Sequence, residues 1–155
     1  MAGLVASPPA PTPDAIIDGD GWWPGLSIAG FRQAMRLQRD VTESRISEAL
    51  LAAMVDVAAE LANWKVVQQC TGAETLEAID APAFGGESRL VLLWRRAVHA
   101  LAAADLADTH SDISATDAGK ERTEIRAASA DEHRRNATQA IRAIKGRSRN
   151  RASLI

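Results

Sequence analysis

Residues 42–67 have the sequence TESRISEALLAAMVDVAAELANWKVV, and this segment decides the fold class. Its large apolar side chains recur every three or four residues, the spacing that lines one face of an α-helix. They are Ile46, Leu50, Met54, Val57, Leu61, Trp64 and Val67. Asp40 or Thr42 can cap the start of the helix, and Gly72 can end it after Cys70. We therefore expect one helix of about 40 Å.

Two further segments have helical periodicity. One begins near Glu87 and has an apolar stripe made of Leu90, Trp94, Ala97, Leu101 and Ala104. The other runs from about Gly119 to Lys145 and has a thinner stripe made of Ile125, Ala128, Ala137, Ile141 and Ile144. A brief helix is expected over residues 27–37, and no segment shows the alternation of a strand. We therefore predict an all-α fold, a small helical bundle with long central helices.

An extended arm is predicted for residues 1–26, ahead of a helical domain over residues 27–146. Residues 1–25 hold five of the six prolines and four of the ten glycines, which shape a chain without giving it a core. The arm ends in Trp22-Trp23-Pro24, where the chain is too broken to bury two indoles locally. These side chains need an apolar surface, either their own core or that of a neighbour.

Residues 147–155 are predicted to leave the domain as a basic tail. Residues 133–155 contain seven Lys or Arg and no acid, whereas residues 1–31 contain three Asp and no Lys or Arg. Opposite charges at the two ends suggest two different contact surfaces. On the residues alone, three interpretations of the tail stay open: a solvated end, a phosphate-binding strip and a protein-docking segment.

No set of residues suited to catalysis or to a cofactor is recognisable. Cys70 has no Cys-x-x-Cys neighbour, and metal-ligand spacing is also missing around His99, His110 and His133. A calcium loop starting at Asp108 would place Ile113 and Gly119 where it needs Gly and Glu. Neither a phosphate-binding loop nor a nucleophile elbow is present. We therefore expect no enzyme activity, no cofactor and no metal.

The sequence also predicts a location. Pro8, Pro9 and Pro11 interrupt the apolar run that a signal peptide would need, and no run of about 18 apolar residues is present to span a membrane. Cys70 is the only cysteine, so an intrachain disulfide is impossible and a reducing cytoplasm suits the chain.

One class of function open to this chain is a small helical nucleic-acid-binding regulator. Lys145, Arg147, Arg149 and Arg151 in the basic tail are spaced like a strip of phosphate contacts. Such a protein would be a monomer or a dimer, and its affinity for DNA would fall steeply with salt.

A series of short segments points to a second class. Along residues 20–155 they are, in order, Trp22-Trp23-Pro24, Phe31-Arg32-x-x-Met35-Arg36-Leu37, Val41-Thr42-x-x-Arg45-Ile46, Glu60-Leu61-Ala62-x-Trp64, Gln68-Gln69, Leu76, Gly86-Glu87-Ser88, Trp94-Arg95-Arg96-Ala97-Val98, Ala103-x-Asp105-Leu106, Ala140-Ile141-Arg142-x-Ile144-x-Gly146-Arg147 and Leu154-Ile155. The ordered set resembles the head completion protein (GPL) family of tailed phages, which acts as a head-tail connector. The chain departs from the family pattern over residues 108–117 and at Arg134-Arg135-Asn136, where the family usually has aromatic residues.

The resemblance implies a structural adaptor, not an enzyme, that forms a ring of about twelve copies under the portal protein after DNA packaging. The ring would provide the docking platform for a downstream neck protein, a tail terminator or stopper, while genomic DNA passes through its channel without sequence-specific binding. The tail is expected to bind the portal through Arg147, Arg149, Arg151, Leu154 and Ile155. The arm is expected to contact a neighbouring subunit through Trp22, Trp23 and Pro24. The expected location is the virion, and the bacterial host cytoplasm during assembly.

Overall fold

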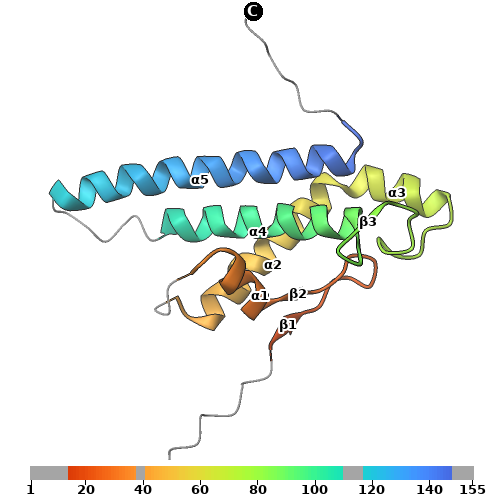
Figure 1. The fold of residues 1–155 in the computed structure, drawn as a ribbon, viewed down its shortest axis with the longest axis horizontal. Coiled ribbons are helices and arrows are strands. Elements are labelled where there is room, and N and C mark those ends of the chain that lie inside the picture. The colour runs from red at the N-terminus through yellow and green to blue at the C-terminus, as the bar shows by residue number, and fades with distance from the viewer. Residues whose placement is uncertain (1–13, 38–40, 110–116, 148–155) are drawn as a thin grey trace, which may run out of the picture.

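The computed structural model describes residues 14–37, 41–109 and 117–147, with side chains described from residue 129 onward in the last range. Over these residues the helices are α1 (Ile28–Ala34), α2 (Glu43–Glu60), α3 (Ala62–Cys70), α4 (Arg89–Thr109) and α5 (Asp117–Ile144). The predicted helical bundle is confirmed (Figure 1).

Two short antiparallel strand pairs correct the expectation that the chain has no strands. β1 (Ile16–Ile17) pairs with β2 (Leu26–Ser27), and β3 (Ala83–Phe84) pairs with β4 (Glu87–Ser88). Each strand has two residues, which is too short to produce an alternating pattern in the sequence. The pairs close loops and leave the helical class unchanged.

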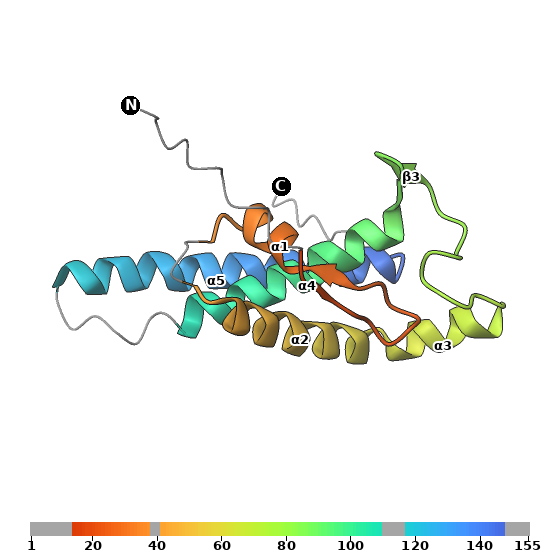
Figure 2. The ribbon, with the colours of Figure 1, turned by 90° about the horizontal axis from the view of Figure 1, so that it is seen from below.

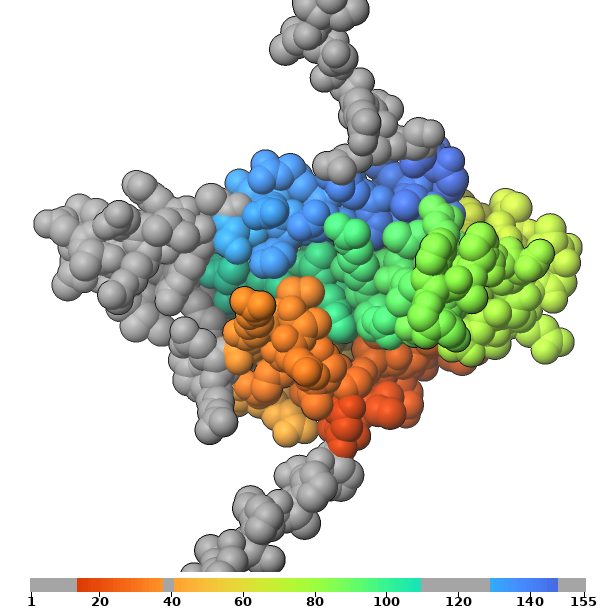
Figure 3. Space-filling view, viewed as in Figure 1, coloured from red at the N-terminus to blue at the C-terminus, as the bar shows by residue number. Residues whose placement is uncertain are grey.

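Helix α4 is the centre of the domain. It runs antiparallel to α5 on one side and packs against α2 on another (Figures 1 and 2). Figure 3 shows α5 (blue) lying along α4 (green), with α1 and the β1–β2 segment (orange and red) across α4 from it. The contact between α4 and α5 is rich in buried alanines, which allow two helices to approach closely: Ala97, Ala100, Ala104, Ala137 and Ala140.

The single long helix expected up to Cys70 is interrupted at Leu61. There the backbone has φ −93° and ψ 2°, yet the Leu61 N–H donates to the Val57 carbonyl at 3.0 Å and the Lys65 N–H to the Leu61 carbonyl at 2.8 Å. Leu61 itself is fully buried. Beyond it the predicted stripe fades, and Val67 is 57% exposed, because α3 extends past the end of α4 (Figure 1).

The folded domain begins before residue 27, so the predicted boundary at residue 26 falls inside it. Four residues of the expected arm are buried in the main core: Ile17, Trp22, Trp23 and Leu26. The largest fully buried side chains of that core come from α1, α2, α4 and the loop after α3, and they include Phe31, Ile46, Leu50, Leu76, Trp94 and Val98.

The predicted helix ends are confirmed at Gly72 and Gly146. Both glycines have a positive φ, 96° and 72°, which side chains rarely adopt. The Ala73 N–H donates to the Gln68 carbonyl at 3.2 Å, and the Arg147 N–H donates to the Arg142 carbonyl at 2.9 Å. These are the closing bonds of glycine-capped helices.

Replacing Gly72 by Ala should lower the free energy of unfolding by about 1 kcal/mol, because a Cβ is strained in the left-handed conformation. The added methyl group would meet no other atom within 4 Å, so the effect isolates backbone strain. The measurement is urea denaturation followed by circular dichroism. Gly72→Asn is the matched control, since Asn tolerates this conformation and should lose less. Equal losses for both variants would contradict this explanation.

Candidate functional site

The expected inter-subunit residues Trp22 and Trp23 lie in an aromatic cluster inside the chain's own core. The Trp23 ring stacks on Trp94 with a centroid distance of 4.3 Å and an interplanar angle of 11°. Trp22 packs edge-on against Trp23 at 4.5 Å and against Trp64 at 6.1 Å. This tryptophan cluster joins the N-terminal segment to α3 and α4.

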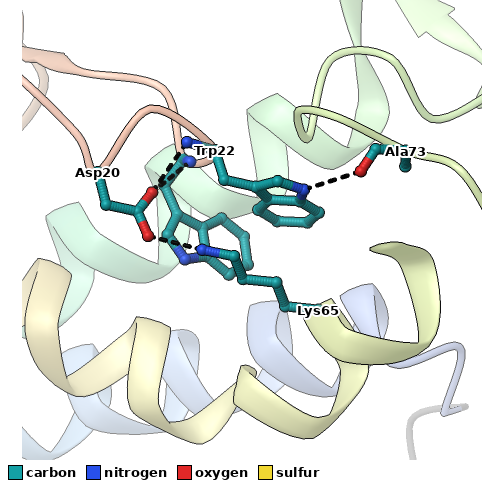
Figure 4. Close-up of polar contacts among 5 residues, drawn as sticks. Asp20, Trp22, Lys65 and Ala73 are labelled. Atoms are coloured by element: carbon teal, nitrogen blue, oxygen red, sulfur yellow. Dashed lines mark hydrogen bonds and ion pairs between the residues drawn. The ribbon is translucent and has the colours of Figure 1, made fainter. Parts of the chain in front are cut away.

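Asp20 and Lys65 form an ion pair beside the tryptophan cluster, where the chain reaches Trp22 and Trp23 (Figure 4). Asp20 Oδ1 accepts hydrogen bonds from the backbone N–H groups of Trp22 at 3.0 Å and Trp23 at 2.9 Å. Asp20 Oδ2 pairs with Lys65 Nζ at 2.6 Å, and the ammonium lies 5.1 Å from the centroid of the Trp22 ring. Burial alone would raise the pKa of Asp20, but the hydrogen bonds from Lys65 and the two N–H groups outweigh it and lower the pKa.

Two indole N–H groups of the cluster donate to backbone carbonyls of the same chain. Trp22 Nε1 donates to the Ala73 carbonyl at 3.2 Å, as Figure 4 shows, and Trp94 Nε1 donates to the Pro24 carbonyl at 3.2 Å. Trp22 and Trp23 are only 5% and 4% exposed. Their side chains therefore do not form the exposed patch that the expected contact with a neighbouring subunit would need, because the chain's own core covers them. Pro24 is half-buried beside them.

Asp20→Ala should destabilise the domain by about 1–2 kcal/mol, because two part-buried N–H groups lose their acceptor and Lys65 loses its partner. The measurement is the free energy of unfolding at pH 7. Asp18→Ala is the matched control, since Asp18 is exposed and has no hydrogen-bond or ion-pair partner within the described ranges. An equal effect of the two substitutions would argue against the role of Asp20.

Only the first residue of the expected portal-binding tail falls within the described structure. Arg147 is exposed just after the end of α5 and lies at one end of a groove between α4 and α5. Arg149, Arg151, Leu154 and Ile155 lie outside the described residues.

The groove has a volume of about 670 Å³ and is strongly basic. Its lining includes five arginines and no acid; we call it the arginine groove, after Arg96, Arg134, Arg135, Arg142 and Arg147. Arg134 is paired with Asp108 and, at 2.9 Å, with Asp131. Within the described ranges the other four arginines have no carboxylate within 4.0 Å. Their charge is therefore available to a partner.

An acidic and apolar surface lies on the outer side of α2. Leu51 is 48% exposed and Val55 is 67% exposed, while Glu48 and Asp56 flank them. The surface also includes Ser44, Ser47 and Ala52, and no Lys or Arg lines it. We call these seven residues the acidic α2 face. The core-facing stripe of α2 does not include Leu51 and Val55, and the one signal for this face in the sequence is that these two apolar residues lie four positions apart between Glu48 and Asp56.

His99 is a buried titratable group on α4. It is 6% exposed, its ring meets Phe31 edge-on at 5.0 Å, and its Nε2 has no hydrogen-bond partner among the described residues. Burial lowers the pKa of His99 to about 4, and the nearby charge of Arg95 adds to the effect. At neutral pH the imidazole is uncharged and behaves as a core residue.

The pKa of His99 predicts loss of stability in mild acid. The unfolded chain binds a proton at this histidine below about pH 6.5 and the folded chain only below about pH 4, so stability falls as the pH drops between these values. From pH 7 to pH 5 the free energy of unfolding should decrease by about 2 kcal/mol at this site. His99→Leu should remove this part of the pH dependence. His133→Gln should keep it, since His133 is not in the core; an unchanged slope in His99→Leu would contradict the assignment.

Within the described ranges, no three His, Cys, Asp or Glu side chains are grouped closely enough to hold a metal ion. No described helix is both long enough and apolar enough to cross a membrane. What the described surface does offer is two charged areas on a helical core, and areas of this kind suit contact with other macromolecules.

The chain belongs to the phage head completion protein (GPL) family, whose model matches residues 17–155. It is 27% identical over 147 residues to the "head completion/stabilization protein" of Escherichia phage P2. The matched region covers 95% of this chain and 87% of the phage P2 protein. It is 25% identical over 145 residues to the "probable head completion/stabilization protein" of Haemophilus phage HP1 (strain HP1c1). The matched region covers 92% of this chain and 93% of the phage HP1 protein. No solved structure matches the chain.

Family membership confirms the resemblance seen in the sequence. The chain is a structural protein of the phage head and a component of the virion. The two relatives are named for completing and stabilising the head.

Proposed function

We propose that this protein completes the phage head as a ring of about twelve copies, assembled in the host cytoplasm under the portal protein after DNA packaging. The ring provides the docking platform for a neck protein, a tail terminator or stopper. Genomic DNA passes through its channel without sequence-specific contacts. The observation that carries the proposal is membership of the head completion family over nearly the whole chain.

The basic tail is the part proposed to bind the portal, through Arg147, Arg149, Arg151, Leu154 and Ile155. Its start at Arg147 is exposed and continues the positive charge of the arginine groove. Arginines can pair with carboxylates in a partner, and the apolar Leu154 and Ile155 can enter an apolar pocket. The expected contact of the N-terminal segment with a neighbouring subunit stays a prediction, and of its three residues only Pro24 is not fully buried.

The alternative function, a nucleic-acid-binding regulator, agrees with the positive charge of the surface but not with the function for which the relatives are named. The arginine groove could accept phosphates, yet the family and both named relatives are structural proteins of phage heads. We therefore assign the positive charge to assembly contacts.

Deleting residues 148–155 should abolish binding to portal particles of the same phage while leaving the helical circular-dichroism signal unchanged. The deletion keeps Gly146 and Arg147, whose N–H group closes α5. Binding is measured by co-sedimentation and by electron microscopy, which should show a discrete ring at one end of the portal with the full chain. The double substitution Leu154→Ser and Ile155→Ser serves as a comparison that keeps every tail charge.

Absence of any association between the full chain and portal particles would refute the proposed function. A truncated protein that loses helicity would show instead that the tail belongs to the folded domain. Retained binding by the truncated protein would move the docking site away from the tail.

A further inference from the structure

We propose that the arginine groove of one copy binds the acidic α2 face of the next copy, so that subunits join head to tail. This inference rests on the proposed ring and assigns its subunit contact to two particular surfaces. The groove lies between α4 and α5, and the acidic α2 face lies on the outer side of α2.

The two surfaces carry opposite charge. On the groove side, Arg96, Arg135 and Arg142 have no carboxylate partner within the described residues. On the α2 side, Glu48 and Asp56 likewise have no cationic partner there. A guanidinium can hold a carboxylate through two parallel hydrogen bonds, which gives such a contact a defined geometry.

The two surfaces also match in their apolar parts. Leu93, Ala140 and Ala143 line the floor of the groove among the arginines. Leu51 and Val55 protrude from α2 among its acids, and both are about half exposed or more. Burying these leucine and valine side chains would give the contact a hydrophobic component beside its ion pairs.

The two surfaces point in different directions, which lets one copy bind a neighbour on each side. On α4, Asp105 lines a small pocket with α2 residues and with Arg134 of α5, so the margins of the two surfaces meet there, whereas Arg96 lines the body of the groove. A separation of nine residues turns a helix by about 180°, so these two residues lie on opposite sides of α4. Helix α2 packs against α4 with its buried stripe and turns Leu51 and Val55 outward. In Figure 2, α2 accordingly forms one long edge of the domain.

Charge also disfavours the two symmetric alternatives. Pairing two arginine grooves would bring unpaired guanidiniums together, and pairing two acidic α2 faces would bring carboxylates together. A two-fold dimer could pair unlike surfaces only if both lay on the same side of a copy; from different sides the contact is heterologous, and its repetition closes into a ring when the rotation between copies allows it. The described surface therefore suits a ring better than a two-fold dimer.

Paired cysteines test the contact directly. In a Cys70→Ser background of the full chain, Val55→Cys places a thiol on the acidic α2 face and Thr138→Cys places one on the edge of the groove. Both positions are exposed. Mild oxidation of the double variant, with and without portal particles, should give a ladder of covalent dimers, trimers and larger species on a denaturing gel.

The single-cysteine variants are the matched controls. Each alone should stay monomeric on the gel, and an equal mixture of the two should give only dimers of one of each kind. Abundant dimers of the Val55→Cys variant alone would mean that two α2 faces meet, which overturns the proposal.

A missing ladder distinguishes failure of the subunit contact from failure of the proposed function. If the double variant binds portal particles but forms no ladder with or without them, the contact is wrong and the proposed function stands. If it neither forms a ladder nor binds the portal, and the unmodified chain also fails to bind, the proposed function itself fails.

Charge reversal gives an independent test. Arg135→Glu with Arg142→Glu should reduce the ladder by about tenfold, because the acidic face of the next copy is then repelled. Adding Glu48→Arg and Asp56→Arg in the same chain should restore it. Arg36→Glu is the control, since Arg36 is exposed and lies outside both surfaces. If the variant with Arg135→Glu and Arg142→Glu loses binding to duplex DNA but keeps an unchanged ladder, the groove binds phosphates and the proposal is overturned.

Discussion

The stacking of Trp23 on Trp94 is the interaction on which the rest of the domain depends. It places a residue of the N-terminal segment against the second turn of the central helix, and the Trp94 indole N–H donates a hydrogen bond to the carbonyl of Pro24. Trp22 then extends the contact to Trp64 and to the loop after α3. Parts of the chain that are distant in sequence are thereby joined around α4, and α5 covers another side of the same helix.

The helices could be predicted from the sequence because their information is local. Apolar spacing identified α2 and α4, and Gly72 and Gly146 marked two helix ends. The place of residues 14–26 in the core could not be found in this way. The prolines and glycines of this segment indicate only its local backbone conformation. The burial of Trp22 and Trp23 depends on surfaces of α3 and α4, which are distant in the sequence. Asp20 did offer a signal, since Asp often accepts hydrogen bonds from backbone N–H groups two and three residues later.

The charged surfaces were predictable only in part, for a related reason. The basic tail is a continuous run and is visible in the sequence. The arginine groove combines Arg96 of α4 with Arg135 and Arg142 of α5, and these residues come together only when the two helices pack side by side. The buried alanines between α4 and α5 thus have two effects: they stabilise the pair, and they bring the arginines of both helices to one groove.

All four tryptophans of the chain, Trp22, Trp23, Trp64 and Trp94, belong to one cluster. The chain has no tyrosine and two phenylalanines, so its ultraviolet emission comes almost entirely from this place. Intrinsic fluorescence of this protein is therefore a local reporter of whether the N-terminal segment is seated on α4. A spectroscopist can follow that single event without attaching a dye, and can compare its rate with the appearance of helical structure elsewhere in the chain.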